Sequence, residues 1–173
     1  MSRFDPNIVR DFVIAGLRDA HAMESQALTL TSAQVDRLVN YPDLKARIQE
    51  HYRETEGQRQ RLETCLSRLD TSASTLKDVT LKAGANFSAL LHSAMDDEVI
   101  KNSLASYAFE HFEIAAYTSL SVAAEALGDA QILEVCKQNL AEERAMADWL
   151  ADHLPPTTQT YLQRASADLQ AKR

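Results

Sequence analysis

Four glutamates lie among the apolar residues of four long amphipathic segments, one in each segment: Glu24, Glu54, Glu113 and Glu143. A carboxylate that faces a protein core is costly to bury unless it is paired, protonated or bound to a cation. Four carboxylates on separate helices converge only if those helices pack around one axis. The pattern therefore predicts a helical bundle with an acidic site in its core.

The composition is that of a helical protein with one domain. The chain has 173 residues, and glycine and proline occur only four times each, so helix propensity is high nearly throughout. The net charge of −7 argues against a nucleic-acid partner, because phosphate binding needs a basic patch. No apolar run approaches the ~20 residues of a membrane span, and residues 1–6 lack a signal-peptide pattern. We therefore expect a cytoplasmic protein with neither a membrane nor a nucleic-acid partner.

The hydrophobic periodicity predicts an all-α, ferritin-like four-helix bundle. A single domain over residues 1–173 should contain helices at about 6–38, 43–69, 74–92, 98–127, 129–153 and 157–169. Short turns join the first two long helices and the last two, so the helices of each pair should be antiparallel. The long segment between the second and third long helices suits a helical crossover along the bundle, which is the ferritin-like connectivity.

Local signals predict where these helices begin and end. Asp5 before Pro6 predicts an N-cap for the first helix, and Gly128 predicts the end of the third long helix. Pro155 and Pro156 should end the fourth long helix, so that a short C-terminal helix follows separately.

Carboxylates and imidazoles recur at a spacing of three residues, which places both members of each pair on one helix face. The pairs are His21 and Glu24, His51 and Glu54, and Glu110 and Glu113. Carboxylate and imidazole ligands suit iron, manganese or zinc. The candidate metal ligands are Glu24, Glu54, Glu113, Glu143, His51 and Glu110. Tyr117, Gln58 and His21 are candidates for side chains that orient these ligands.

Two positions depart from the di-iron carboxylate pattern. That pattern places histidine three residues after the glutamates of two helices, but this chain has Gly57 and Met146 there. A glycine inside a helix costs ~1 kcal/mol relative to alanine, so Gly57 needs a packing reason or a site reason, for instance the close approach of a neighbouring helix. A metal-free bundle, in which His51, Gln58 and Tyr117 neutralise the buried acids, remains the alternative to a metal site.

Four motifs resemble the YciE/YciF family of bacterial ferritin-like, rubrerythrin-related proteins, and the YciE branch in particular. The motifs are LRDAHAME (17–24), HYRETEGQRQRLE (51–63), FEHFEIAAYTSL (109–120) and EERAMADWL (142–150). The resemblance implies a rubrerythrin-like bundle, a homodimer and a role in stress responses. It carries the ferritin-like ligand glutamates over onto Glu24, Glu54, Glu113 and Glu143. Candidate dimer surfaces are Phe87, Leu90 and Leu91 of the crossover, and the face that carries Trp149.

These observations favour a stress-associated protein with two iron or manganese ions in the bundle core that react with peroxide or oxygen. The alternative is a metal-free structural or interaction module, and iron storage in a cage ranks last. The chain has no Cys-x-x-Cys pair, so a rubredoxin-type electron-transfer module is absent. The residues identify neither catalytic side chains nor a redox or protein partner.

Overall fold

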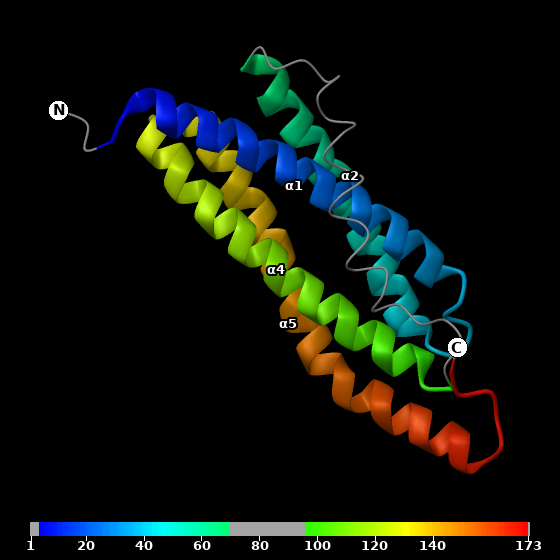
Figure 1. Cartoon of the computed structure of the whole chain (residues 1–173). Coiled ribbons are helices and arrows are strands. Elements are labelled where there is room, and N and C mark those ends of the chain that lie inside the picture. The colour runs from blue at the N-terminus through cyan, green and yellow to red at the C-terminus, as the bar shows by residue number, and fades with distance from the viewer. Residues whose placement is uncertain (1–3, 70–95, 173) are drawn as a thin grey trace.

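The computed structural model describes residues 4–69 and 96–172. The described part is built from four helices: α1 (Pro6–Val35), α2 (Pro42–Arg68), α4 (Glu98–Leu127) and α5 (Ala130–Ser166). α1 packs against α2 and α4, and α5 packs against α4 and α2, so the four helices surround a common core (Figure 1). The predicted all-α, ferritin-like bundle is confirmed.

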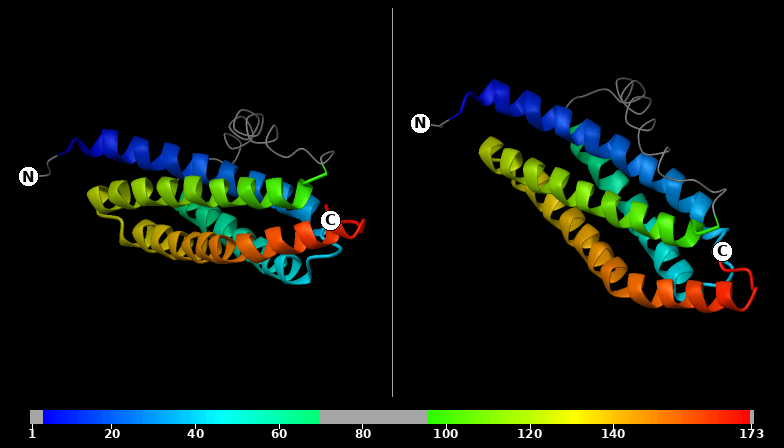
Figure 2. Two further views of the ribbon diagram at one scale, coloured as in Figure 1. Left: turned by 90° about the horizontal axis from the view of Figure 1, so that it is seen from below. Right: turned by 60° about the horizontal axis from the view of Figure 1, so that its bottom comes forward.

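The helix directions are those expected for one long crossover. α1 and α2 are antiparallel, as are α4 and α5, whereas α2 and α4 run in the same direction (Figure 2). Leu69, after α2, accepts a hydrogen bond from Arg10 near the start of α1. Glu98, at the start of α4, pairs with Arg37 beyond the end of α1. The connection from α2 to α4 therefore leaves α2 beside the start of α1 and reaches α4 beside the end of α1. The helix expected at 74–92 lies outside the described residues.

The predicted helix ends follow local chemistry. The Asp5 carboxylate accepts a hydrogen bond from the Asn7 amide at the start of α1. Gly128 ends α4 with a φ of 76°, a left-handed conformation that glycine adopts without strain. Asp129 then caps α5 by accepting a hydrogen bond from the Ile132 amide at 3.0 Å. A two-residue connection, Gly128 and Asp129, therefore reverses the chain between α4 and α5.

One helix-boundary prediction is wrong. Pro155 and Pro156 lie inside α5, so the separate C-terminal helix expected at 157–169 is a continuation of the same helix. Two consecutive prolines leave the carbonyl groups of Ala151 and Asp152 without helical N–H donors. All four of these residues are exposed, so the freed carbonyls lie on a solvent-accessible stretch of the helix, and α5 bends along its orange part (Figure 2). Exposure of the interruption is what allows the helix to continue.

Two apolar clusters fill the bundle and leave a polar layer between them. The first includes Val13, Leu17, Leu62, Tyr117, Leu120, Ile132 and Cys136. The second, nearer the α1–α2 connection, includes Leu38, Tyr41, Leu44, Ile48, Val99, Met146 and Leu150. On α2 the buried residues between Ile48 and Leu62 are all polar: His51, Thr55 and Gln58. The bundle therefore places its acidic side chains at mid-height, away from both ends.

The close helix approach expected at Gly57 occurs instead at Gly16. A Cβ added to Gly16 of α1 would lie 2.9 Å from Leu120 Cδ1 of α4. A Cβ added to Gly57 would meet only the flexible end of Arg61, at 3.4 Å. Gly57 therefore has room for a side chain, and packing of a neighbouring helix does not explain it.

Candidate metal centre

The polar layer contains five ionisable side chains that are almost fully buried. Each of them is at most 4 % exposed, and they are Glu24 on α1, His51 on α2, Glu110 and Glu113 on α4, and Glu143 on α5. Each faces the core because its neighbours one turn away on the same helix are themselves buried. All four helices therefore contribute to one acidic layer.

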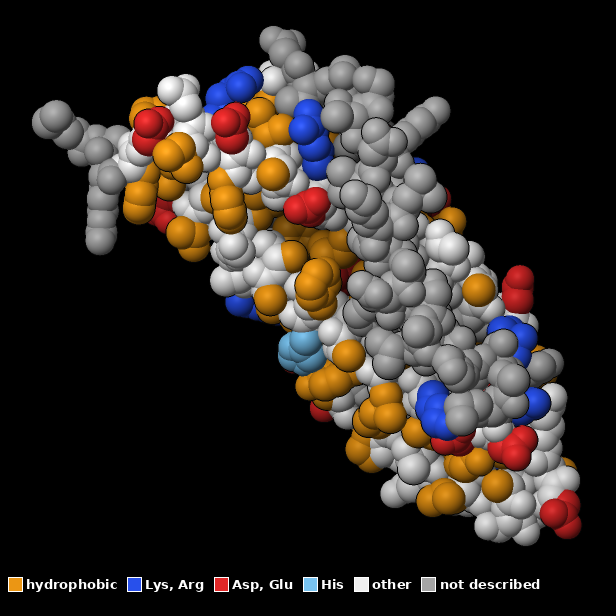
Figure 3. All heavy atoms as spheres, in the orientation of Figure 1, with side chains coloured by type: hydrophobic (Ala, Val, Ile, Leu, Met, Phe, Trp, Pro, Cys, Tyr) orange, Lys and Arg blue, Asp and Glu red, His pale blue; other side chains and the backbone are white. Residues whose placement is uncertain are grey.

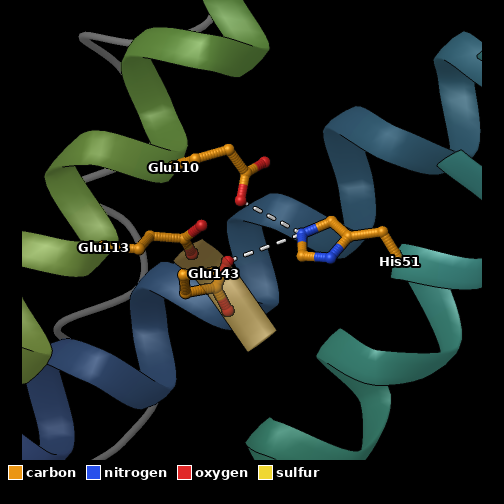
Figure 4. A group of neighbouring side chains, drawn as sticks. All are labelled: His51, Glu110, Glu113 and Glu143. Carbon is orange, nitrogen blue, oxygen red and sulfur yellow. Dashed lines mark ion pairs between the residues drawn. The ribbon is translucent and has the colours of Figure 1, made fainter. Parts of the chain in front are cut away.

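Four of these side chains form a compact group: His51, Glu110, Glu113 and Glu143. One potential ligand atom from each lies within 4.8 Å of those of the others. Figure 4 shows the three carboxylates and the imidazole pointing toward one another from α4, α5 and α2. His51 Nε2 lies 3.3 Å from Glu110 Oε2 and 3.6 Å from Glu143 Oε2. This arrangement has the ligand types and the spacing of a divalent-cation site.

The hydrogen-bond potential of the layer is largely unused. Among the described residues, no N–H or hydroxyl donates to either oxygen of Glu113 or to Oε2 of Glu24, and Oε2 of Glu110 and of Glu143 has only the His51 imidazole beside it. Buried polar atoms in native proteins almost always have a partner, so this many free acceptors in one place require a cation, bound water or shared protons. The residues therefore fit a metal ion on grounds independent of the sequence pattern.

Burial and mutual repulsion raise the pKa values of the acids. Burial, followed by the charges of Glu143 and Glu24, raises the pKa of Glu113 well above 4.5. Burial and the proximity of Glu110 likewise raise the pKa of Glu143. Burial raises the pKa of Glu24 to about 8, although a hydrogen bond from Tyr117 opposes the shift. The raised pKa values favour the protonated forms of these acids unless a cation takes the place of the protons.

His51 compensates part of this charge. Burial alone lowers the pKa of His51, but Glu110, Glu54 and Glu143 outweigh burial and raise it well above 6.5. Nδ1 lies 2.9 Å from Glu54 Oε2, so Nε2 faces the acidic group. A carboxylate on the far nitrogen is the usual support for a metal-binding histidine, because it fixes the tautomer and the ring orientation.

Glu54 lies at the edge of the layer rather than in it. Its side chain is 28 % exposed, and its Oε2 accepts hydrogen bonds from Arg47 at 3.1 Å and from His51. The hydrogen bond from His51 is the main reason that the pKa of Glu54 is lowered. The structure therefore places Glu54 behind His51, outside the four-residue group.

The rotation of α2 and α5 about their axes explains why positions 57 and 146 do not carry the histidines of the di-iron pattern. Gly57 is half-buried, on the same side of α2 as Glu54, whereas His51, Thr55 and Gln58 face the core. A histidine at position 57 would therefore not share the core-facing side of α2 with His51. Met146 packs in the second apolar cluster, one turn beyond Glu143. On α2 the candidate ligand in the four-residue group is His51, three residues before the glutamate instead of three residues after it.

A hydrogen-bonded chain positions the acids from behind. Tyr117 donates to Glu24 Oε1, and Asn139 Nδ2 donates to the Tyr117 oxygen at 2.9 Å. Arg61 Nε in turn donates to Asn139 Oδ1 at 2.8 Å. Sequence reasoning expected Tyr117 to support the site but missed Asn139. The available signal was its position one turn before Glu143 on the buried face of α5.

The two other predicted supporting residues differ in their roles. Gln58 was expected to orient one of the ligand glutamates, and its Nε2 donates to Glu143 Oε1 on another helix. His21 lies outside the layer, with Nε2 2.9 Å from Glu63 Oε1. Glu24 is buried beside the compact group and interacts electrostatically with Glu110 and His51, although it is not one of its four members.

Comparisons with known proteins agree with this architecture. A family described as "Domain of unknown function (DUF892)" matches residues 9–163. Protein YciF of Escherichia coli K12 is 30 % identical over 152 residues, which cover 83 % of this chain and 89 % of YciF.

Two crystal structures share the fold. A protein from Xanthomonas campestris pv. campestris is 35 % identical, with a TM-score of 0.77, over 91 % of this chain and 99 % of that one. The E. coli stress protein YciF is 23 % identical in the structural alignment, with a TM-score of 0.68, over 84 % and 94 %. None of the described helices is long and apolar enough to cross a membrane. The chain therefore belongs to the DUF892 family, in agreement with the YciE/YciF resemblance of its four motifs.

Proposed function

We propose that the acidic layer binds two iron or manganese ions. His51, Glu110, Glu113 and Glu143 would be ligands, and Glu24 would complete the donor set from α1. The observation that carries this proposal is the buried Glu113 side chain, to which no N–H or hydroxyl of the described residues donates and whose hydrogen-bonding neighbour is another acid, Glu143. Keeping such a carboxylate ionised costs several kcal/mol, and a directly bound cation removes that cost.

The charges support two ions rather than one. Glu24, Glu110, Glu113 and Glu143 together carry four negative charges when ionised. Two divalent cations balance these charges if His51 binds as a neutral imidazole. Carboxylate-rich sites with few nitrogen ligands suit iron and manganese, and bridging carboxylates hold two such ions about 3.5–4 Å apart.

Bound iron or manganese would supply redox chemistry toward peroxide or oxygen. The protein would supply the rest. Glu54 orients His51, Gln58 orients Glu143, and Tyr117 orients Glu24. The two apolar clusters exclude bulk water from both sides of the layer. Because the relative YciF is described as a stress protein, we assign this chain a role in stress responses, in the bacterial cytoplasm.

Metal content tests this proposal directly. Untagged protein is loaded anaerobically with Fe(II) or Mn(II), desalted and analysed for bound metal. We expect about two ions per chain for the wild type and for Glu56→Gln, a control at an exposed position of α2. Glu113→Gln should lose most of the metal. Fewer than a few tenths of an ion per wild-type chain would refute the proposal.

The alternative function is a metal-free structural or interaction module. It is favoured by the raised pKa values of Glu113 and Glu143, because protons can also neutralise the layer. This alternative predicts that a chelator leaves the melting temperature unchanged. A chelator-induced drop would argue against it, since a ligand that binds only the folded state stabilises that state by mass action.

We also propose that the expected homodimer forms through an exposed apolar face on α1 and α4. Its residues are Phe4 just before α1, Ile8 and Phe12 on α1, and Phe112 and Val122 on α4. Hydrophobic side chains gather over these helices in Figure 3. An isologous contact would pair this face with its own copy, and patches of this kind are rare on monomers. Trp149 is a weaker candidate because its ring already stacks on His153 at 3.7 Å. Sedimentation of Phe12→Asp protein, with Phe112→Ser as a second variant, should show a monomer.

A further inference from the structure

A narrow pocket leads from the surface to the acidic layer between α1 and α4. Its volume is about 30 Å³. Half-buried Leu30, Thr31 and Ser106 lie at its outer part, and buried His51 and Glu110 lie at its inner end. The pocket therefore ends at two members of the four-residue group.

The wall of this pocket carries one buried hydrogen-bond donor that is unused. Gln34 is only 7 % exposed, and its Nε2 donates no hydrogen bond, whereas its Oε1 accepts from Ser106 Oγ at 3.5 Å. Glu110 Oε2, at the inner end of the pocket, lies 3.3 Å from His51 Nε2. A small molecule that accepts a hydrogen bond would satisfy the Gln34 amide. Hydrogen peroxide accepts hydrogen bonds through the lone pairs of its hydroxyl oxygens, whereas dioxygen, which is apolar, is a far weaker acceptor.

The size of the pocket sets a limit on what can pass. One water needs at least about 10–15 Å³ of this kind of volume, so the pocket holds two or three atoms of oxygen size. Hydrogen peroxide has two such atoms. Organic hydroperoxides with bulky substituents do not fit without displacement of the walls.

The larger cavity on the same side of the molecule does not lead to the layer. It has a volume of about 600 Å³ and lies between α1 and α4 beside Phe12 and Phe112. Its lining contains none of the five ionisable side chains of the layer. Its walls are mostly apolar, so it provides no polar path for peroxide.

We propose that the pocket between Thr31 and Ser106 is the entrance by which hydrogen peroxide reaches the acidic layer, and that Gln34 positions it by a hydrogen bond. The proposal rests on the proposed function, since it assumes a metal in the layer. It names hydrogen peroxide as the substrate and distinguishes it from dioxygen and from organic hydroperoxides.

A larger side chain at the outer part of the pocket tests whether hydrogen peroxide reaches the acidic layer by this route. Ser106→Phe adds bulk at the outer part of the pocket, and Ser119→Phe adds the same bulk at an exposed position of the same helix. Both variants should bind as much Mn(II) as the wild type at equilibrium. In Ser106→Phe alone, Mn(II)-dependent relaxation of water protons and oxidation of bound Fe(II) by hydrogen peroxide should fall by about tenfold, equivalent to ~1.4 kcal/mol in barrier. Thr31→Phe, on the opposite wall, replaces Ser106→Phe if the latter does not fold.

Removal of the Gln34 side-chain amide tests whether the pocket favours hydrogen peroxide over dioxygen. Gln34→Leu should slow the reaction with hydrogen peroxide about fivefold, the equivalent of one net hydrogen bond, and leave the reaction with dioxygen unchanged.

These measurements distinguish failure of the proposed function from failure of the proposed entrance and of its size limit. A wild-type protein without metal would overturn the proposed function itself. Normal metal content with equal relaxation and oxidation rates in Ser106→Phe and Ser119→Phe would overturn the entrance alone. Cumene hydroperoxide that reacts as fast as hydrogen peroxide would overturn the size limit.

Discussion

Replacement of Glu24 by glutamine should stabilise the metal-free protein. Burial raises the pKa of Glu24 from 4.5 to about 8, so at pH 7 the folded protein holds a proton that the unfolded chain has released. Each pH unit between the unfolded pKa and the working pH corresponds to about 1.36 kcal/mol, so the buried acid costs about 3 kcal/mol at pH 7 and about 1 kcal/mol at pH 5. Glutamine keeps an oxygen that accepts the hydrogen bond from Tyr117, but it does not ionise.

The sign of the pH dependence follows from the direction of the shift. Because the folded pKa of Glu24 is raised, its contribution to stability is fully present below pH 4.5 and is lost as the pH rises toward 8. The advantage of Glu24→Gln over the wild type should therefore grow with pH. At pH 7 it should reach about 3 kcal/mol, which for a chain of this length is a rise of roughly 6–12 °C in melting temperature.

Urea unfolding of chelator-treated protein at pH 5 and pH 7 measures this difference. Glu56→Gln, at an exposed position of α2, is the control and should show little change at either pH. Glu24→Gln should in addition weaken Mn(II) binding, because it replaces a proposed ligand oxygen. An equal gain at both pH values, or a loss of stability at pH 7, would refute the electrostatic reasoning.

Four further changes have defined outcomes. Metal affinity should increase from pH 5 to pH 8, because the raised pKa values of Glu24, Glu113 and Glu143 make protons compete with the metal; calorimetry in buffers of different ionisation enthalpy should show proton release. His51→Leu should destabilise the metal-free protein by about 3–5 kcal/mol in urea unfolding, because it removes the cation that faces Glu110 and Glu143, and an unchanged midpoint would contradict this. Gly57→Ala should stabilise the protein by about 1 kcal/mol, because a Cβ meets only Arg61, while Gly16→Ala should gain less or lose stability against Leu120. Burial raises the pKa of Cys136 to about 12, so this thiol should react with a thiol reagent at pH 8 only as fast as the protein unfolds; rapid labelling of native protein would count against this placement.

The positions of the acids in the sequence predicted much of the site. Glu24, Glu113 and Glu143 recur in register with apolar residues, and a helix buries every residue that shares its apolar face. Glu54 differs because His51 lies three residues before it, and positions three and four residues apart lie on nearly the same side of a helix. Packing of α2 against α1 and α5 turned His51, Thr55 and Gln58 inward and left Glu54 at the edge.

Local chemistry alone determined the helices, the caps at Asp5 and Gly128, and the antiparallel pairs, since each depends on residues close together in the chain. Only the tertiary structure decided which distant side chains meet. The partnership of His51 with Glu110 and Glu143, the donation from Gln58 to Glu143, and the chain from Arg61 through Asn139 to Tyr117 each join separate helices. The rotation of each helix about its axis sets these contacts, and that rotation is the outcome of packing across the whole core. The same holds at Pro155 and Pro156, where exposure on the folded surface decided that α5 bends instead of ending.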